Sequence, residues 1–558
     1  MNKNFRLLPL ALLIAGSVLA QGSSKKDAPP NMWHLMDPAT SGYSGVSAEK
    51  AHAFLKGTGR KSNTVLVAVI DSGIDTAHQD LKPILWKNSK EIPNNGKDDD
   101  KNGYIDDVHG WNFIGGKDGR NVKEDSYEAA RVYHSLKTKW EGKTATGLTG
   151  AQLKEFNTYE RAKEKIVGDV DPLAAQQLKT MVPELKESDK ALRAALGKEE
   201  YNGNDIKDFN SPNKEINVMK DFLIRISKAN NSYEITNKQI LEQLDGELRK
   251  AESVTQAPPT FRKDIVQDNY LDFTDKYYGN NDLMAETSLH GTHCAGIIAA
   301  VRDNNKGAMG IADNVRIMAI RAVPDGDEHD KDIALAIRYA VDNGAKVISM
   351  SFGKDFSPEK KWVDDAIQYA AAKGVLLVHA AGNDSKDLDK EFNFPSTVFE
   401  DGVRATNVIT VGASGDAKNG GLTARFSNYG KNEVDVFAPG VGIYSTLPGG
   451  DQYGNLQGTS MACPLVAGVA ALILQYYPTL TPQQVKMAIE KSSVAPKDMV
   501  NIPGTTTKAK LSDLSRSGGI MNAEAAVKYA STLVGEKINV QKKKRTLPKT
   551  KVSRGNKG

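Results

Sequence analysis

The sequence predicts an α/β protein in which helices cover a mostly parallel sheet. Residues 65–70 read Val-Leu-Val-Ala-Val-Ile, a continuous apolar run typical of a strand buried on both faces of such a sheet. Beyond residue 289, strand patterns alternate with helix patterns, as expected where helices connect parallel strands. The predicted strands are 315–323, 346–352, 375–381 and 407–413, and the predicted helices between them are 332–343 and 359–373.

The first 20 residues have the three parts of a secretory signal peptide. Lys3 and Arg6 form a basic start, residues 7–20 are apolar, and the stretch ends in the small residue Ala20, where a signal peptidase cleaves. A buried helix is the alternative, but the two basic residues stand where export requires them. We therefore expect a secreted or periplasmic protein. No later apolar run is long enough to cross a bilayer, so no transmembrane anchor is expected.

The chain divides into parts of different composition. Residues 21–45 are polar and contain adjacent prolines, which predicts a flexible leader. Residues 117–284 are rich in Lys, Glu, Ala, Leu and Gln, with amphipathic helix patterns separated by Gly, Asn and Pro. We interpret this segment as a helical insertion that divides an α/β domain into residues 46–116 and 285–535.

Helices predicted at 482–491 and 523–533 close the fold, and a basic tail follows at 536–558. Its last 18 residues hold eight Lys and Arg and no acid, which predicts disorder. The formal net charge of +4 depends on this tail. The rest of the chain is mildly acidic, which argues against a nucleic-acid-binding protein. At 558 residues the chain is too long for one ordinary core, and its oligomeric state is not predicted.

An acidic loop predicts a structural calcium site. Carboxylates or an amide alternate along residues 98–106, and Gly103 occupies the sixth place, where a calcium loop turns sharply. His109 stands where an EF-hand has its last glutamate, so the match is partial. A solvated acidic turn is the alternative. The candidate ligands are Asp98, Asp100, Asn102, Tyr104 and Asp106.

Three residues in separate stretches suggest nucleophilic catalysis. Ser460 lies where a tight turn enters an apolar helix, and unpaired N–H groups at such a helix start stabilise an oxyanion. By itself it is better explained as a partial N-cap of a buried helix. Asp71 follows the strand at 65–70, the end at which α/β folds place their sites. His290 opens a second helix of small residues.

The sequences around these residues resemble the subtilisin-like serine proteases (subtilases, peptidase family S8) of the exported bacterial type. The matching stretches are Val-Ile-Asp71-Ser-Gly-Ile-Asp, His290-Gly-Thr-His and Gly-Thr-Ser460-Met-Ala, in the order found in subtilisin. A fourth stretch, Ala-Ala-Gly-Asn383-Asp, resembles the oxyanion loop of that family. The resemblance implies an endopeptidase with Ser460 as nucleophile, His290 as base, Asp71 as the residue that orients the base, and Asn383 as oxyanion donor.

The resemblance also implies a three-layer subtilisin-like fold, protein or peptide substrates, and two stretches that line the substrate pocket. These stretches are Ser351, Phe352 and Gly353, and Ala380, Ala381 and Gly382. Gly353, Ala380, Ala381 and Gly382 are small, which predicts a pocket wide enough for large apolar residues.

Several features depart from a compact subtilase. Asp71 and His290 stand 219 positions apart, so the predicted insertion is expected near the rim of the site. The leader is too short for the usual inhibitory prodomain. Cys294 and Cys463 are the only cysteines, which excludes a disulfide scaffold; two free thiols and one disulfide both remain open. A non-catalytic scaffold, or a transpeptidase or cyclase using the same acyl-enzyme, is an alternative function.

Overall fold

A seven-stranded parallel sheet forms the centre of the protein. The computed structural model describes residues 29–168, 172–229, 233, 235–417 and 421–536. The sheet order is β2-β3-β1-β4-β5-β6-β7, and every pair is parallel. The strands are β1 (Val65–Asp71), β2 (Gly110–Asn112), β3 (Val315–Arg321), β4 (Val347–Met350), β5 (Leu376–Ala380), β6 (Val408–Ser414) and β7 (Val436–Pro439). The predicted α/β fold class is confirmed.

The two faces of the sheet carry separate hydrophobic cores. Along β1, Val65, Val67 and Val69 join one core, whereas Ala68 and Ile70 join the other. This alternation follows from the two-residue period of a strand, and it explains why the run is apolar throughout. The first face is covered by α3 (Ala48–Gly57), α11 (Leu289–Ala299), α14 (Thr459–Tyr476), α15 (Pro482–Lys491) and α16 (Ala523–Ser531), and the second by α12 (Asp330–Asp342) and α13 (Lys360–Ala372). The helices and strands predicted in this part of the chain are confirmed to within a few residues.

The sheet order places a switch point between β1 and β4. The chain runs from β1 to the β3 side of the sheet and then returns to β4 on the other side. In an open α/β sheet, connections leave in opposite directions at such a point, and a crevice forms beyond the carboxyl ends of the strands. Asp71, at the end of β1, and Ser351, directly after β4, therefore flank this crevice.

Helix α14 is the central helix of the first core. Among the described residues, one helix is long and apolar enough to cross a membrane, and it is this one, with 94% of its residues buried inside the protein. The helix is apolar because it is buried against β4, β5, β6 and β7.

Part of the expected leader is packed rather than flexible. Residues 1–28 lie outside the described part, as does most of the basic tail, from residue 537. Within the remaining leader, Trp33 and Leu35 are buried in the first core. The Trp33 indole N–H lies 3.2 Å from the carbonyl oxygen of Val441. The prediction of flexibility to residue 45 was wrong for residues 33–35, because the two prolines precede a short helical turn whose apolar side chains reach the core.

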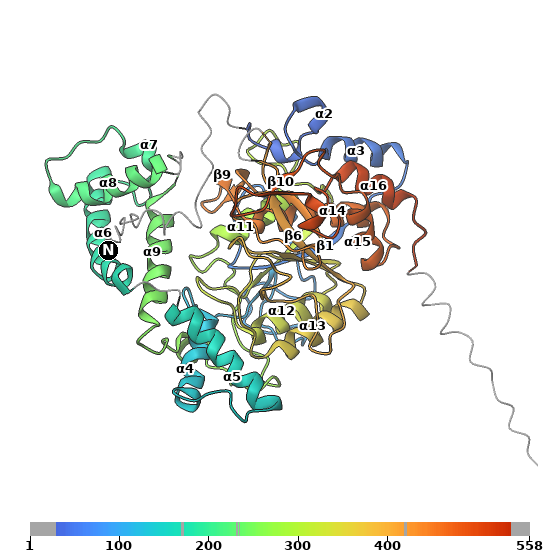
Figure 1. Cartoon of the computed structure of the whole chain (residues 1–558). Helices are drawn as coiled ribbons and strands as arrows, with labels where there is room; N and C mark the ends of the chain where they lie inside the picture. Colours follow the sequence, from blue (N-terminus) through green and yellow to red (C-terminus); the bar gives the residue numbers. More distant parts are fainter. Residues whose placement is uncertain (1–28, 169–171, 230–232, 234, 418–420, 537–558) are drawn as a thin grey trace, which may run out of the picture.

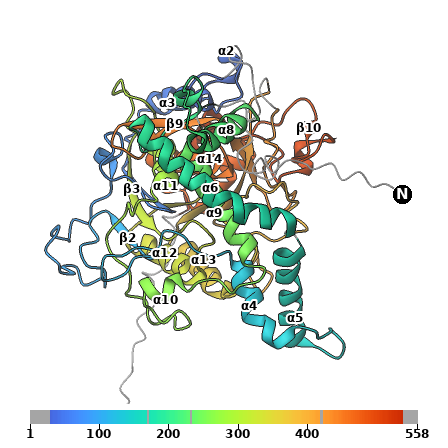
Figure 2. The same cartoon turned by 90° about the vertical axis from the view of Figure 1, so that its left-hand side faces the viewer.

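The segment between β2 and α11 is helical and builds two further cores. One core joins α4, α5 and Phe356, and the other joins α6 to α9. Figure 1 shows α6 to α9 standing beside the body that holds the sheet, and Figure 2 shows the same helices from the front. The helices are α4 (Glu128–Trp140), α5 (Gly150–Lys163), α6 (Pro172–Leu196), α7 (Gly203–Ile206), α8 (Lys214–Ala229), α9 (Asn237–Glu252) and α10 (Phe261–Ile265).

Two small antiparallel pairs complete the fold. They are β8 (Ile443–Leu447) with β9 (Gln452–Leu456), and β10 (Val500–Asn501) with β11 (Lys508–Ala509). The first pair packs against α11, which carries His290.

Candidate active site

Asp71 and His290 meet at the carboxyl end of β1. His290 is the second residue of α11, and its Nδ1 lies 2.7 Å from Asp71 Oδ1. Since a carboxylate only accepts hydrogen bonds, Nδ1 carries the proton and Nε2 is left free as a base. The Ser72 N–H donates to the same oxygen at 2.8 Å. Gly291 permits this approach, because a Cβ there would lie 2.2 Å from the Gly73 carbonyl oxygen.

The charge of Asp71 controls the ionisation of His290. Burial by itself lowers the pKa of the imidazole, but the carboxylate of Asp71 outweighs it and holds the pKa of His290 well above its usual range. His293, one helical turn further, behaves in the opposite way. Its Nε2 lies 3.2 Å from the carbonyl oxygen of Gly454, and burial lowers its pKa to about 3. His293 is thus neutral and packed between α11 and β9.

Ser460 lies at the start of α14, beside Ser351. It is the second residue of the helix, so its N–H has no intrahelical partner. The Ser460 hydroxyl donates to the Ser351 carbonyl at 3.2 Å, and the Ser351 hydroxyl donates to the Ser460 carbonyl at 3.0 Å. Cys294 connects this serine with the base, since its Sγ lies 3.4 Å from the Ser460 carbonyl oxygen and 4.0 Å from His290 Nδ1. The three predicted catalytic residues therefore lie in one place.

Asn383 is held so that its amide donor lies beside the serine. Its Oδ1 accepts from the Thr459 N–H at 2.9 Å and from the Thr459 hydroxyl at 3.0 Å. A Cβ placed on Gly458 would lie 3.4 Å from Asn383 Nδ2 and 3.5 Å from the Ser460 nitrogen. Both donors thus flank Gly458, whose φ of +149° is a conformation that favours glycine. Both N–H groups therefore lie near Ser460 as candidate oxyanion donors.

Both cysteines are free and buried. The structure therefore shows two free thiols and no disulfide between Cys294 and Cys463. Burial raises the pKa of the Cys294 thiol, and it raises the pKa of Cys463 to about 12. The Cys463 sulfur lies 3.2 Å from the carbonyl oxygen of Val378 in β5. Both thiols are neutral packing groups, one of them inside the site.

The two predicted substrate-binding stretches follow neighbouring strands. Ser351–Gly353 comes directly after β4, and Ala380–Gly382 continues from the end of β5, so the two stretches lie side by side near Ser460, and we call the space between them the slot. The backbone of Phe352 is held by His379, whose Nε2 lies 2.8 Å from the Phe352 carbonyl oxygen. Burial lowers the pKa of His379 to about 4, so this histidine is neutral.

Asn393 fills part of this slot. Its Nδ2 donates to the carbonyls of Ala381 at 3.1 Å and of Ala380 at 3.4 Å. A Cβ added to Gly353, on the opposite wall, would lie 2.7 Å from Asn393 Oδ1. The side chain therefore spans the slot from wall to wall. The width of the substrate pocket stays a prediction, and Asn393 narrows the space that the small residues of both walls would otherwise leave.

The acidic loop brings together only part of the predicted ligand set. Ligand oxygens of Asp98, Asp100 and Glu91 lie within 4.8 Å of one another. Glu91 is buried, and its Oε2 has no hydrogen-bond partner. Asp106 points elsewhere: its carboxylate accepts the N–H groups of Asn95 and Gly96 at 3.1 and 2.8 Å.

The remaining two predicted ligands have structural partners. Asn102 Oδ1 accepts the Tyr104 N–H at 2.8 Å, and Asn102 Nδ2 donates to Asp107 at 2.9 Å. The Tyr104 ring packs against Trp111 and Tyr339 in the second core, so only its backbone carbonyl is available as a ligand.

Two functional candidates were not found by sequence reasoning. Asn393 lies ten residues beyond the recognised oxyanion motif, in a loop without a pattern of its own. Glu91 precedes the acidic loop, and nothing in its spacing to Asp98 indicates that the chain folds it back onto the loop. Both act through tertiary contacts, which local patterns do not encode.

Several known proteins are similar in sequence to this chain. A model described as the subtilase family matches residues 62–520. The chain is 38% identical over 240 residues to subtilisin DY of Bacillus licheniformis, which covers 42% of this chain and 77% of that protein. It is 36% identical over 271 residues to thermitase of Thermoactinomyces vulgaris, with 47% and 86% covered. It is 45% identical over 203 residues to a thermophilic serine proteinase of Bacillus sp. (strain AK1), of which it spans less than half the length, with 36% and 45% covered.

The parallel fold, the site at its switch point and these matches define a serine endopeptidase that acts on peptides. The chain belongs to the subtilase family, and the matched region includes Asp71, His290, Asn383 and Ser460.

Proposed function

We propose that this chain is an exported endopeptidase that hydrolyses peptide bonds through an acyl-enzyme on Ser460. The observation that carries the proposal is the 2.7 Å contact between His290 Nδ1 and Asp71 Oδ1. It fixes the tautomer in which Nε2 is an unprotonated base, on the helix that packs against the one bearing Ser460.

Each residue of the site then has one role. Ser460 Oγ attacks the peptide carbonyl, and His290 Nε2 takes its proton and passes it to the leaving amine. Asp71 stabilises the imidazolium that forms between these two steps. Asn383 Nδ2 and the Ser460 N–H hold the negative oxygen, and water then releases the acyl group by the reverse proton path. The hydroxyl of Ser460 exchanges its contact with Ser351 for one with His290 when substrate binds, as catalytic hydrogen bonds commonly form only in the substrate complex.

Hydrolysis of a peptide anilide tests these roles. Replacing Ser460 by Ala lowers kcat by roughly 10⁶-fold, because nucleophile and base act as a unit, and His290→Ala has an effect of similar size. Asn383→Ala lowers kcat by about 10²- to 10³-fold. Undiminished turnover by folded Ser460→Ala would refute the proposal.

We propose calcium as the structural ion of the acidic loop, with Glu91, Asp98 and Asp100 as side-chain ligands. The residues fit the ion, since calcium prefers carboxylate oxygens and the buried Glu91 Oε2 lacks any other partner. A cation also offsets the repulsion among these carboxylates. When bound, the ion stabilises the loop and takes no part in peptide hydrolysis.

We infer export from the sequence of residues 1–20, and we interpret residues 117–284 as an insertion into the peptidase domain formed by 46–116 and 285–535. The two separate cores of α4 to α9 support the second inference. N-terminal sequencing of the exported protein is expected to begin at Gln21. A mature protein that keeps residues 1–20 would contradict the proposal of export.

A further inference from the structure

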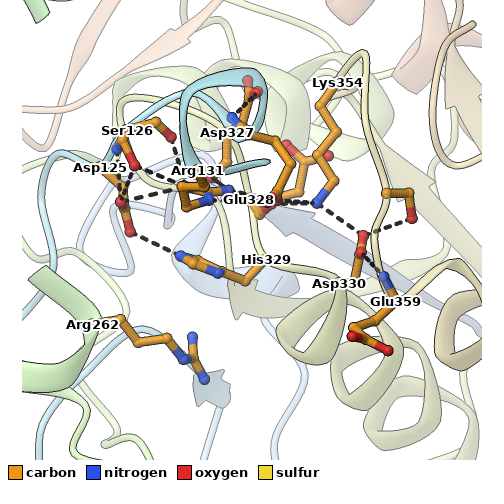
Figure 3. A network of polar contacts seen from close by, with 12 residues as sticks. Asp125, Ser126, Arg131, Arg262, Asp327, Glu328, His329, Asp330, Lys354 and Glu359 are labelled. Atoms are coloured by element: carbon orange, nitrogen blue, oxygen red, sulfur yellow. Dashed lines mark hydrogen bonds and ion pairs between the residues drawn. The ribbon is translucent and has the colours of Figure 1, made fainter. Parts of the chain in front are cut away.

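The residue after the substrate-binding stretch Ser351–Gly353 is a buried lysine. Lys354 is 5% exposed. Its ammonium donates to the carbonyl of Glu328 at 2.7 Å and lies 2.9 Å from a carboxylate oxygen of Asp330 and 2.9 Å from one of Glu128. All three ammonium protons therefore have partners, and Figure 3 shows Lys354 reaching toward Glu328 and Asp330. This lysine fixes the end of the stretch against which the substrate lies.

Glu128 comes from α4, far from the sheet in sequence. Its Oε1 and Oε2 accept from Arg131 at 3.2 and 2.7 Å, and its N–H donates to Asp327 at 2.7 Å. Burial by itself raises the pKa of Glu128, but the charges of Arg131 and Lys354 lower it well below its usual range. Glu128 is therefore ionised, and it joins the first turn of α4 to Lys354.

A second contact comes from α5. The Arg161 guanidinium lies 4.2 Å from the centre of the Phe356 ring and 4.3 Å from that of Phe392. It also donates to the carbonyl of Asp355 at 3.3 Å. Phe356 is itself part of the core that joins α4 and α5. Residues 354–356 are thus held by both helices.

The same lysine is coupled to the floor of the slot. The backbone N–H of Lys354 donates to the backbone carbonyl of Phe394 at 3.1 Å, and the backbone N–H of Phe394 donates to the backbone carbonyl of Lys354 at 2.9 Å. Phe394 directly follows Asn393, which spans the slot. A shift of Lys354 therefore moves both Gly353 and Asn393.

We propose that Glu128 is a positioning residue for peptide hydrolysis, which acts through Lys354 to hold Ser351–Gly353 in register with the substrate. The inference rests on the proposed function, because it assigns that stretch to substrate binding. Helix α4, which begins at Glu128, would then help to shape the substrate cleft. Glu128 touches no reacting atom, and its effect depends on the length of the substrate that lies along the stretch.

Two substrates measured on Glu128→Gln test this. One is a tetrapeptide anilide, which extends along the stretch, and the other is an activated ester of a single acetylated amino acid, which does not. All rates are divided by the concentration of active sites titrated with a fluorophosphonate, so unfolded molecules do not count. We expect the ratio of kcat/KM for tetrapeptide over ester to fall by about 10- to 100-fold, mainly through a higher KM for the tetrapeptide, because a small misplacement of a binding stretch has effects of this size.

Glu155→Gln is the matched control. Glu155 pairs with Lys139 of α4 at 2.7 Å on the exposed side of the same helix pair, so the charge change is equal but Lys354 is untouched. We expect it to keep the wild-type ratio. If Glu128→Gln yields no titratable protein, it is combined with Lys354→Met and Asp330→Asn, so that the buried lysine and both carboxylates beside it are neutralised together; the ratio is expected to fall there too.

If titratable Glu128→Gln keeps the wild-type ratio of kcat/KM for tetrapeptide over ester, the proposal is overturned. This holds even if the variant melts at a lower temperature, because the ion pair would then contribute to stability alone. Failure of the proposed function looks different, since the wild-type protein itself would then neither take the label nor hydrolyse the ester.

Discussion

At the scale of single residues, the pH range of activity follows from one carboxylate. Asp71 holds the pKa of His290 well above its usual range, although burial acts in the opposite direction. Only the neutral imidazole accepts the proton of Ser460. Activity is therefore present above the raised pKa and is lost as the pH falls through it.

We predict that kcat/KM against pH has an acid limb with an apparent pKa above 6.5, the ordinary value of a histidine. In Asp71→Asn the imidazolium loses its counter-charge, so the limb moves to lower pH while kcat falls by about 10⁴-fold. The pH profile of anilide hydrolysis measures both changes. A limb that stays in place in Asp71→Asn would show that another group sets it.

Asn393 is predicted to restrict the side chain that precedes the cleaved bond. The amide spans the slot between Gly353 and Ala381, and it also lines a hollow of about 270 Å³ with His379 and Thr410. Removing it in Asn393→Ala opens the slot toward this hollow. We expect the ratio of kcat/KM for Phe over Ala at this substrate position to rise by at least about tenfold, since added apolar contact in a pocket is worth this much.

A remote asparagine is the control for that change. Asn314 stands before β3, at the amino edge of the sheet, and donates to Ser62 at 3.0 Å. Asn314→Ala is expected to leave the Phe-to-Ala ratio unchanged. Equal ratios in Asn393→Ala and wild type would mean that the slot is not where this side chain binds.

The sequence predicts the residues that act at the ends of regular elements better than those that act from loops. Asp71, His290 and Ser460 each sit where a strand ends or a helix begins, so local pattern marks them. Asn393 and Glu91 contribute only after the chain has folded back, through contacts with segments distant in sequence. Local pattern contains no record of those contacts.

At the scale of elements, the proposed calcium site predicts that the acidic loop is stabilised by its ion. Its three carboxylates lie within 4.8 Å of one another. We predict that calcium raises the melting temperature, by an amount that corresponds to about 2.7 kcal/mol at a concentration of 100 times Kd. Glu91→Gln is expected to remove most of this increment, because it replaces the buried carboxylate by a neutral amide.

Thermal unfolding in calcium and in EGTA measures the increment. Asp118→Asn serves as control, since this exposed aspartate pairs with Arg120 outside the loop. An increment that is the same in Glu91→Gln and in wild type would place the ion elsewhere.

The regular elements of the body were predictable because their patterns are strong. The strand at β1 and the capping box that opens α15 at Thr481 are examples in which propensity, periodicity and end signals agree. Short elements such as β2 and β9 were not predicted, since three to five residues carry no distinct period and their pairing depends on neighbours in the sheet. The turn at Trp33 was missed for the same reason.

At the scale of the whole molecule, the helices between Asp71 and His290 fall into two groups with different relations to the body. The α4–α5 group shares Phe356 with the body, whereas α6 to α9 form a core of their own. Arg249 of α9 ties that second group to Asp325 of the body and to Glu124; the Arg249 side chain is 15% exposed, whereas both carboxylates are about half exposed. Because water reaches these carboxylates, each pair contributes only about 1 kcal/mol.

We therefore predict that α6 to α9 are dispensable for folding of the body. Ile166 and Val254, which flank these helices, pack in the same core, so a short Gly-Ser linker can replace residues 169–252. The shortened protein is expected to keep a cooperative thermal transition and ester hydrolysis per titrated site. Loss of the folded body in this variant would show that the two groups form one unit.

In the proposed mechanism, Asp71 and His290 activate Ser460 for attack on a carbonyl. The position of a covalent adduct tests this activation most directly. Intact protein treated with a fluorophosphonate is digested, and the modified residue is located by mass spectrometry. We expect one adduct, on Ser460, that forms in wild type, forms far more slowly in His290→Ala and is absent in Ser460→Ala. An adduct on another residue, or none in folded wild-type protein, would contradict it.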